Sequence, residues 1–275
     1  MRNRSQSATD HFDKRLEALD ATDFNRRAWD NIARSRHRWF TPAPADQILQ
    51  AKAGEFSIRL TACKQIPQDW LGDIRGRRIL ALAAGGGHQG PILAAAGASV
   101  TVVDISEGQL EIDQRMADEH DLDLQTTRCD MADLGHFDDA SFDMVINPCS
   151  VNFAPDVRPI WHETARVLRD GGVMIAGLIQ PVNYLFDETA RDDRKLTVRF
   201  QIPYSDLDLP DDERDRTIGP ERPIDFGHTL TDLIGGQLDA GFHLTAIMED
   251  TWGGDDVLSE HIATFLATRS IRVPR

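Results

Sequence analysis

Short apolar runs alternate with helical stretches through the middle of the chain. Runs rich in apolar and β-branched residues predict strands at residues 78–83, 99–103, 124–128, 142–146 and 173–179. Helical periodicity between them predicts helices at residues 90–97, 108–120 and 156–168. Strands that alternate with helices favour a parallel sheet covered on both faces. The pattern therefore predicts a doubly wound, Rossmann-like α/β fold.

The segment before this core has a different pattern. Residues 11–36 carry an apolar stripe at helical spacing with a break near residues 20–23, and residues 46–53 predict a short helix. We therefore expect residues 1–70 to form an N-terminal helical cap and residues 71–275 to form the main domain.

The segment after the core begins with an interruption. Residues 181–228 contain five prolines and break the α/β alternation, so we expect an insertion that covers the binding site. A helix at residues 230–238 is predicted to end at Gly241, in the left-handed conformation that glycine adopts most easily. Two last strands are predicted at residues 242–247 and 262–268.

Composition narrows the possible partners and compartments. The formal net charge is −15, which disfavours nucleic acid as a partner. The three cysteines, Cys63, Cys129 and Cys149, are far apart and have no metal-binding spacing, so we expect neither a disulfide framework nor a metal site. No apolar run is long enough to span a membrane, and the opening residues do not resemble a secretory signal. We expect a cytoplasmic enzyme and leave its oligomeric state open.

A glycine-rich loop follows the first predicted strand. Its glycines Gly85, Gly87 and Gly90 permit close approach of a ligand, and Asp104 ends the next strand, where a carboxylate can accept hydrogen bonds from both hydroxyls of a ribose. The same spacing suits a nicotinamide dinucleotide enzyme. However, Pro91 removes an amide donor where a pyrophosphate would bind. An NAD(P)-binding oxidoreductase and a non-catalytic cofactor-binding protein remain as alternatives.

Three further segments carry a family resemblance. Asp130-Met131 follows the third predicted strand, residues 142–148 contain the fourth, and residues 163–172 end the helix before the fifth. With the glycine loop, they make the sequence resemble class I S-adenosylmethionine-dependent methyltransferases over roughly residues 70–270. Residues 85–97, 155–161 and 234–242 look like a bacterial subgroup of that family, and this likeness implies no particular acceptor.

The resemblance implies a fold and a set of cofactor-binding residues. The fold would be a seven-stranded sheet of five parallel strands and a C-terminal pair with one antiparallel strand. The residues expected to bind S-adenosylmethionine are Ala83, Gly85, Gly87, Gln89, Asp104, Ile105, Gln109, Asp130, Met131, Asn147 and Pro148. Two positions depart from the family pattern: Ala81 stands where an acid often orders the glycine loop, and Ala83 where a glycine is common. The loop must therefore be held in another way.

The acceptor site is less defined. We expect a small-molecule acceptor bound beneath residues 181–228, with the methyl group directed near Asn147. Tyr184, Tyr204 and His228 are the candidate substrate contacts, and His228 or Tyr204 is the candidate residue that orients or deprotonates the acceptor. A packing or capping role is the alternative for each. His88 follows the glycines and either flanks the cofactor or faces solvent.

Overall fold

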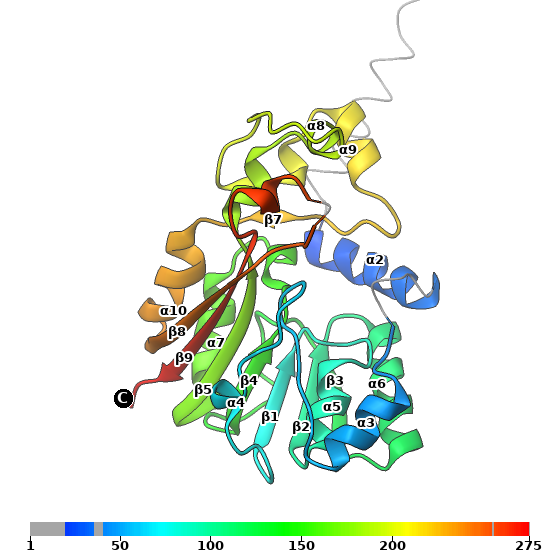
Figure 1. Cartoon of the computed structure of the whole chain (residues 1–275), viewed down its shortest axis with the longest axis vertical. Coiled ribbons are helices and arrows are strands. Elements are labelled where there is room, and N and C mark those ends of the chain that lie inside the picture. Colours follow the sequence, from blue (N-terminus) through cyan, green and yellow to red (C-terminus); the bar gives the residue numbers. More distant parts are fainter. Residues whose placement is uncertain (1–19, 36–40, 255, 275) are drawn as a thin grey trace, which may run out of the picture.

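A computed structural model describes residues 20–35, 41–254 and 256–274 of the chain (Figure 1). The part of the predicted N-terminal stripe that precedes residue 20 lies outside the described residues. From residue 20 the stripe forms helix α2, Ala21–Ser35. The Asp20 carboxylate accepts hydrogen bonds from the amides of Thr22 and Asp23, so Asp20 caps the start of this helix.

A seven-stranded sheet forms the centre of the molecule, in the order β3-β2-β1-β4-β5-β9-β8. The strands are β1 Arg78–Leu82, β2 Ser99–Asp104, β3 Leu124–Arg128, β4 Phe142–Asn147, β5 Leu168–Ile179, β8 Phe242–Asp250 and β9 Phe265–Arg272. The first five strands are parallel, and β9 runs antiparallel to both of its neighbours. The predicted sheet, with its one antiparallel strand, is confirmed.

Some predicted boundaries were wrong. The fifth strand begins at Leu168 instead of residue 173, because Gly171 and Gly172 form an irregularity within the strand where the pairing with β4 shifts register. The last strand begins at Phe265 instead of residue 262, because the chain still turns through the short helix η5, Leu258–Glu260. Gly241 does take the left-handed conformation, with φ of 93°.

Helices cover both faces of the sheet. One face packs against the helices α3 Ala45–Lys52, α4 Gln68–Leu71, α5 Gln89–Ala95 and α6 Glu107–His120. The other face packs against α7 Arg158–Val167 and against the helical turn that combines η4 Thr231–Gly235 with α10 Gly236–Asp239. Side chains on both faces are fully buried, as in other doubly wound folds. Within the described ranges, no helix is both long and apolar enough to cross a bilayer.

Residues 181–228 form a layer above the carboxyl edge of the sheet (Figure 1). Its elements are η2 Pro181–Leu185, α8 Glu188–Asp192, β6 Tyr204–Ser205, η3 Asp206–Asp208, α9 Asp211–Thr217 and β7 Phe226–Gly227. Strands β6 and β7 pair as a small antiparallel ribbon. Helix α2 lies between this layer and the sheet, so it touches both parts of the molecule.

The segment that precedes α4 passes very close to β5 at Gly177. A Cβ atom on Gly177 would lie 2.7 Å from the carbonyl carbon of Leu60 and would overlap the carbonyl oxygen. That oxygen accepts a hydrogen bond of 3.1 Å from the amide of Cys149, which follows β4. Only glycine therefore allows the segment around Leu60 to cross the ends of β4 and β5.

We expect Gly177→Ala to lower the free energy of unfolding by about 1–3 kcal/mol, because the backbone of Leu60 must move away. Urea unfolding measures this change. Gly235→Ala is the matched control, since the nearest atom to its added Cβ is 3.7 Å away. Equal unfolding midpoints for Gly177→Ala and the parent would show that the close approach is wrong.

Candidate active site

A cavity of about 500 Å³ opens at the carboxyl ends of the parallel strands. Ligands bind at this edge in open α/β sheets. The cavity lining includes most of the residues predicted to bind the cofactor, namely Ala83, Gly85, Gln89, Asp104, Ile105, Gln109, Asp130, Met131 and Pro148. The structure therefore brings these nine residues together around one space.

Asp104 ends β2 and faces the glycine loop. Its Oδ2 accepts a hydrogen bond of 3.1 Å from the Gly85 amide, and its Oδ1 accepts one of 3.0 Å from the Ser106 amide. Burial raises the pKa of Asp104 to about 6, although these amide hydrogen bonds favour the charged form. The carboxylate is thus positioned by the backbone and still has lone pairs for a ligand.

Asp113 of α6 holds the glycine loop. Its Oδ2 accepts hydrogen bonds from the amides of Gly86, at 2.8 Å, and Gly87, at 3.1 Å. Burial raises the pKa of Asp113 to about 7. Asp113 therefore replaces the acid that the family often has at the position of Ala81. The sequence contained a signal for this role, because an acid at position 113 interrupts the buried stripe that Leu110 and Met116 form along α6.

The hydrogen bonds that the loop amides already make limit the kind of ligand that can bind beside them. The amides of Gly85, Gly86 and Gly87 all donate to carboxylates of this chain. A pyrophosphate needs free amide donors at this place, and nearby carboxylates would repel it. The geometry is therefore unsuited to a dinucleotide, in spite of the matching glycine spacing.

Two predicted cofactor residues do not line the cavity. Gly87 has a φ of 78°, and a Cβ there would lie 2.7 Å from the sulfur of Met116, so the glycine serves loop packing. Asn147 is fully buried, and its Nδ2 donates to the carbonyl of Leu82 and to the hydroxyl of Ser150. Asn147 thus positions the ends of β1 and β4 in this structure.

The predicted acceptor residues lie outside the cavity lining. The hydroxyl of Tyr184 donates to Asp225 at 2.9 Å, and the hydroxyl of Tyr204 donates to Asp206 at 2.8 Å. The two rings stack with centroids 5.3 Å apart. His228 places Nε2 3.2 Å from the carbonyl oxygen of Val151.

Asp225 and Asp206 join these tyrosines into one polar cluster. The Asp225 amide donates to Asp206 at 2.8 Å, and Asn152 donates to the Asp225 carboxylate at 2.9 Å. Burial raises the pKa of Asp225 to about 7. These hydrogen bonds attach residues 181–228 to the core, and Oδ1 of Asn152 has no partner among the described residues.

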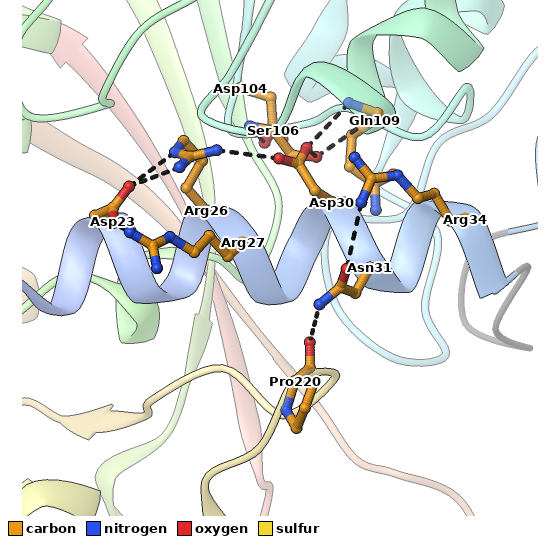
Figure 2. A network of polar contacts seen from close by, with 11 residues as sticks. Asp23, Arg26, Arg27, Asp30, Asn31, Arg34, Asp104, Ser106, Gln109 and Pro220 are labelled. Carbon is orange, nitrogen blue, oxygen red and sulfur yellow. Dashed lines mark hydrogen bonds and ion pairs between the residues drawn. The ribbon is translucent and has the colours of Figure 1, made fainter.

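Helix α2 connects the site with the layer above it. Figure 2 shows Asp30 pointing from α2 toward Ser106 and Asn31 pointing the opposite way, toward Pro220. Asp30 accepts hydrogen bonds from the Ser106 hydroxyl, at 2.7 Å, and from the Gly108 amide, at 3.1 Å. Asn31 donates to the Pro220 carbonyl at 2.9 Å. The backbone that positions Asp104 is therefore braced by α2.

Comparison with known proteins identifies the family. Residues 80–176 match the family described as methyltransferase domain. The chain is 42% identical to the uncharacterized methyltransferase YbaJ of Bacillus subtilis over 250 residues, which are 90% of this chain and 97% of YbaJ. The chain belongs to the S-adenosylmethionine-dependent methyltransferases. The predicted class I resemblance is confirmed.

Two other similarities cover less of the sequence or show the fold alone. The chain is 39% identical to the demethylmenaquinone methyltransferase of Clavibacter sepedonicus over 102 residues, which are 37% of this chain and 41% of that enzyme. The crystal structure of an S-adenosylmethionine-dependent methyltransferase from Mesorhizobium loti superposes with a TM-score of 0.58 at 18% identity, covering 74% of this chain and 94% of that one. The methyltransferase sheet is therefore shared.

The residues of the cavity fit S-adenosylmethionine. A Cβ on Gly85 would lie 2.7 Å from the Cβ of Gln109 and 3.0 Å from Oδ2 of Asp104, so glycine keeps the loop close to the carboxylate. Gln109 is 2% exposed, and its side-chain amide has no hydrogen-bond partner among the described residues. Asp104 would hold the ribose, and Asp130 at the end of the adjacent strand β3 would face the adenine. A cofactor without phosphate also suits the amide pattern of the loop.

Proposed function

We propose that this methyltransferase transfers a methyl group to a small organic molecule by in-line displacement. The proposal rests on the extent of the cavity along the edge of the sheet. It extends from Asp104 and Asp130, at the ends of β2 and β3, past Pro148 to Ile179 and Phe265 beside β5 and β9. One continuous space thus offers a cofactor site and an acceptor site side by side.

S-adenosylmethionine, when bound, supplies an electrophilic methyl group on a positively charged sulfur. The contribution of the chain is to align an acceptor with that methyl group and to exclude water. Alignment alone can lower a barrier by about 7–11 kcal/mol. Helix α2 supports this role, because its residues Thr22 and Trp29 line the cavity. We further propose that α2 and residues 181–228 together form the cap of the site.

Charge and composition support a small acceptor. A net charge of −15 opposes binding of polyanionic nucleic acid. The named activity of the Clavibacter relative, methylation of demethylmenaquinone, points to the same substrate class. The three cysteines are free thiols, which supports work in a reducing compartment, and we place the enzyme in the cytoplasm.

Calorimetric titration tests the cofactor part of the proposal. We expect S-adenosylhomocysteine to bind, and NAD⁺ and NADP⁺ to give no signal, because the loop amides already donate to carboxylates of the chain.

Two further experiments test the acceptor part of the proposal. Random DNA at about 0.15 M salt should show no electrophoretic shift. Labelled cofactor incubated with a small-molecule extract should give a labelled product for mass spectrometry. A salt-sensitive DNA shift, or tight NAD⁺ binding without any response to S-adenosylhomocysteine, would contradict the proposal.

A further inference from the structure

The acceptor end of the cavity can be located from the sheet order. The cofactor carboxylates Asp104 and Asp130 lie at β2 and β3, whereas Ile179 ends β5 and Phe265 begins β9. Because β9 is antiparallel, its first residue lies at the same edge of the sheet as the last residue of β5. The end beside β5 and β9 is therefore the end farthest from the ribose and adenine contacts. This step rests on the proposed function.

Aromatic and apolar side chains form that end of the cavity. Trp252 and Phe265 meet edge to face, with ring centroids 4.5 Å apart and an angle of 76° between their planes. Phe265 is 2% exposed, whereas Trp252 is 42% exposed and still lines the cavity. Ile179 and Pro148 complete the apolar surface. Such a surface favours a flat, unsaturated ring over a polar or flexible chain.

His88 is the histidine among the ionisable residues that line the cavity. Its Nδ1 is buried and has no hydrogen-bond partner within the described part of the chain, which leaves Nε2 as the ring nitrogen for a ligand. The next side chain, Gln89, donates to the carbonyl of Arg59 at 2.8 Å. The neighbouring carbonyl of Leu60 accepts from the amide of Cys149. The residue next to His88 is thus hydrogen-bonded to the segment that crosses the ends of β4 and β5.

We propose that the acceptor is a planar aromatic molecule with an ionisable hydroxyl group, its ring against Trp252 and its hydroxyl at Nε2 of His88. The hydroxyl proton passes to His88, and the oxygen supplies the electron pair of the new carbon–oxygen bond while the pair of the broken carbon–sulfur bond stays on sulfur. Burial lowers the pKa of His88, and the Arg59 guanidinium lowers it further. The imidazole is therefore neutral at pH 7 and able to accept a proton.

Calorimetry with matched probes tests this inference on protein saturated with S-adenosylhomocysteine. The probes are 4-nitrophenol, nitrobenzene, which lacks only the hydroxyl, and cyclohexanol, which keeps the hydroxyl and lacks the aromatic ring and the nitro group. We expect 4-nitrophenol to bind at least about tenfold more tightly than cyclohexanol. Trp252→Ala should weaken both aromatic probes by about tenfold. His88→Ala should weaken 4-nitrophenol by about tenfold and nitrobenzene by less than twofold.

A spectroscopic arm separates proton transfer from packing. Bound 4-nitrophenol should ionise at lower pH on the parent than on His88→Gln, as measured by nitrophenolate absorbance, because only histidine can accept the proton. Trp252→Phe keeps an aromatic face and should retain most of the affinity. His243→Ala and Ile247→Ala, exposed positions on β8, are the controls and should behave like the parent.

The outcomes of these experiments separate failure of the proposed function from failure of the aromatic-acceptor inference alone. Failure of S-adenosylhomocysteine to bind would overturn the proposed function and this inference with it. Intact S-adenosylhomocysteine binding with equal affinity for cyclohexanol and 4-nitrophenol would overturn the aromatic acceptor alone. Equal ionisation of 4-nitrophenol on the parent and on His88→Gln would remove His88 as the proton acceptor.

Discussion

Replacing Asp113 by alanine is expected to lower the free energy of unfolding by about 2–5 kcal/mol, because one buried amide donor loses its acceptor and a second keeps only a longer hydrogen bond of 3.3 Å to the Gln109 carbonyl. Those donors belong to Gly86 and Gly87, and Asp113 is fully buried. The same change should weaken S-adenosylhomocysteine binding at least about tenfold, since the loop is no longer fixed beside Gly85. Urea unfolding and calorimetric titration measure the two effects.

Asp113→Asn is the matched control, because its side-chain oxygen can still accept from both amides. It also tests the raised pKa. A carboxyl with a pKa of about 7 in the folded protein and 3.8 as its ordinary value binds more protons when folded, so its contribution to stability is lost as the pH rises toward 7. Relative to the parent, Asp113→Asn should gain about 2–3 kcal/mol of stability between pH 5 and pH 8. Alanine and asparagine variants of equal stability would contradict the role of the acceptor.

The sequence predicted the sheet well because each of its signals is local. A strand such as Val100–Val103 is recognisable from β-branched residues alone, and Gly85 and Asp104 follow strands whose carboxyl ends must meet at one edge. Nine of the predicted cofactor residues therefore line one cavity. The π-helical turn at Thr231–Gly235 was predicted as ordinary helix, since hydrophobic spacing does not separate these forms over five residues.

The acceptor end could not be predicted because it depends on contacts between distant segments. Trp252 and Phe265 meet only after β9 has paired with β5. Tyr184 and Tyr204 suggested a ligand because they lie in the insertion and combine a flat apolar ring with a hydroxyl group. Their partners turned out to be Asp225 and Asp206, two acids of the same insertion. A pattern along the chain does not show which polar groups satisfy one another.

Asp104→Ala should weaken S-adenosylhomocysteine binding on the order of 100-fold, because charge-assisted hydrogen bonds are worth about 1.5–3 kcal/mol and both ribose hydroxyls lose their acceptor. Asp123→Ala, an exposed acid just before β3, is the control and should bind like the parent. Thermal unfolding checks that the variant is folded, since Asp104 also accepts from Gly85 and Ser106.

The pH dependence of cofactor binding gives a second and independent test of Asp104. The pKa of Asp104 in the free protein is about 6, and hydroxyl donors favour the ionised carboxylate. Affinity should therefore be constant above about pH 7 and fall by up to about tenfold per pH unit below pH 6. Asp104→Asn keeps one acceptor oxygen, for either the Gly85 or the Ser106 amide, and cannot ionise, so its weaker affinity should not vary over this range. Asp113 titrates close by, and its own asparagine variant should leave the fall below pH 6 in place. A parent protein whose affinity does not change between pH 5 and pH 8 would show that the Asp104 carboxylate is not the group that holds the ribose.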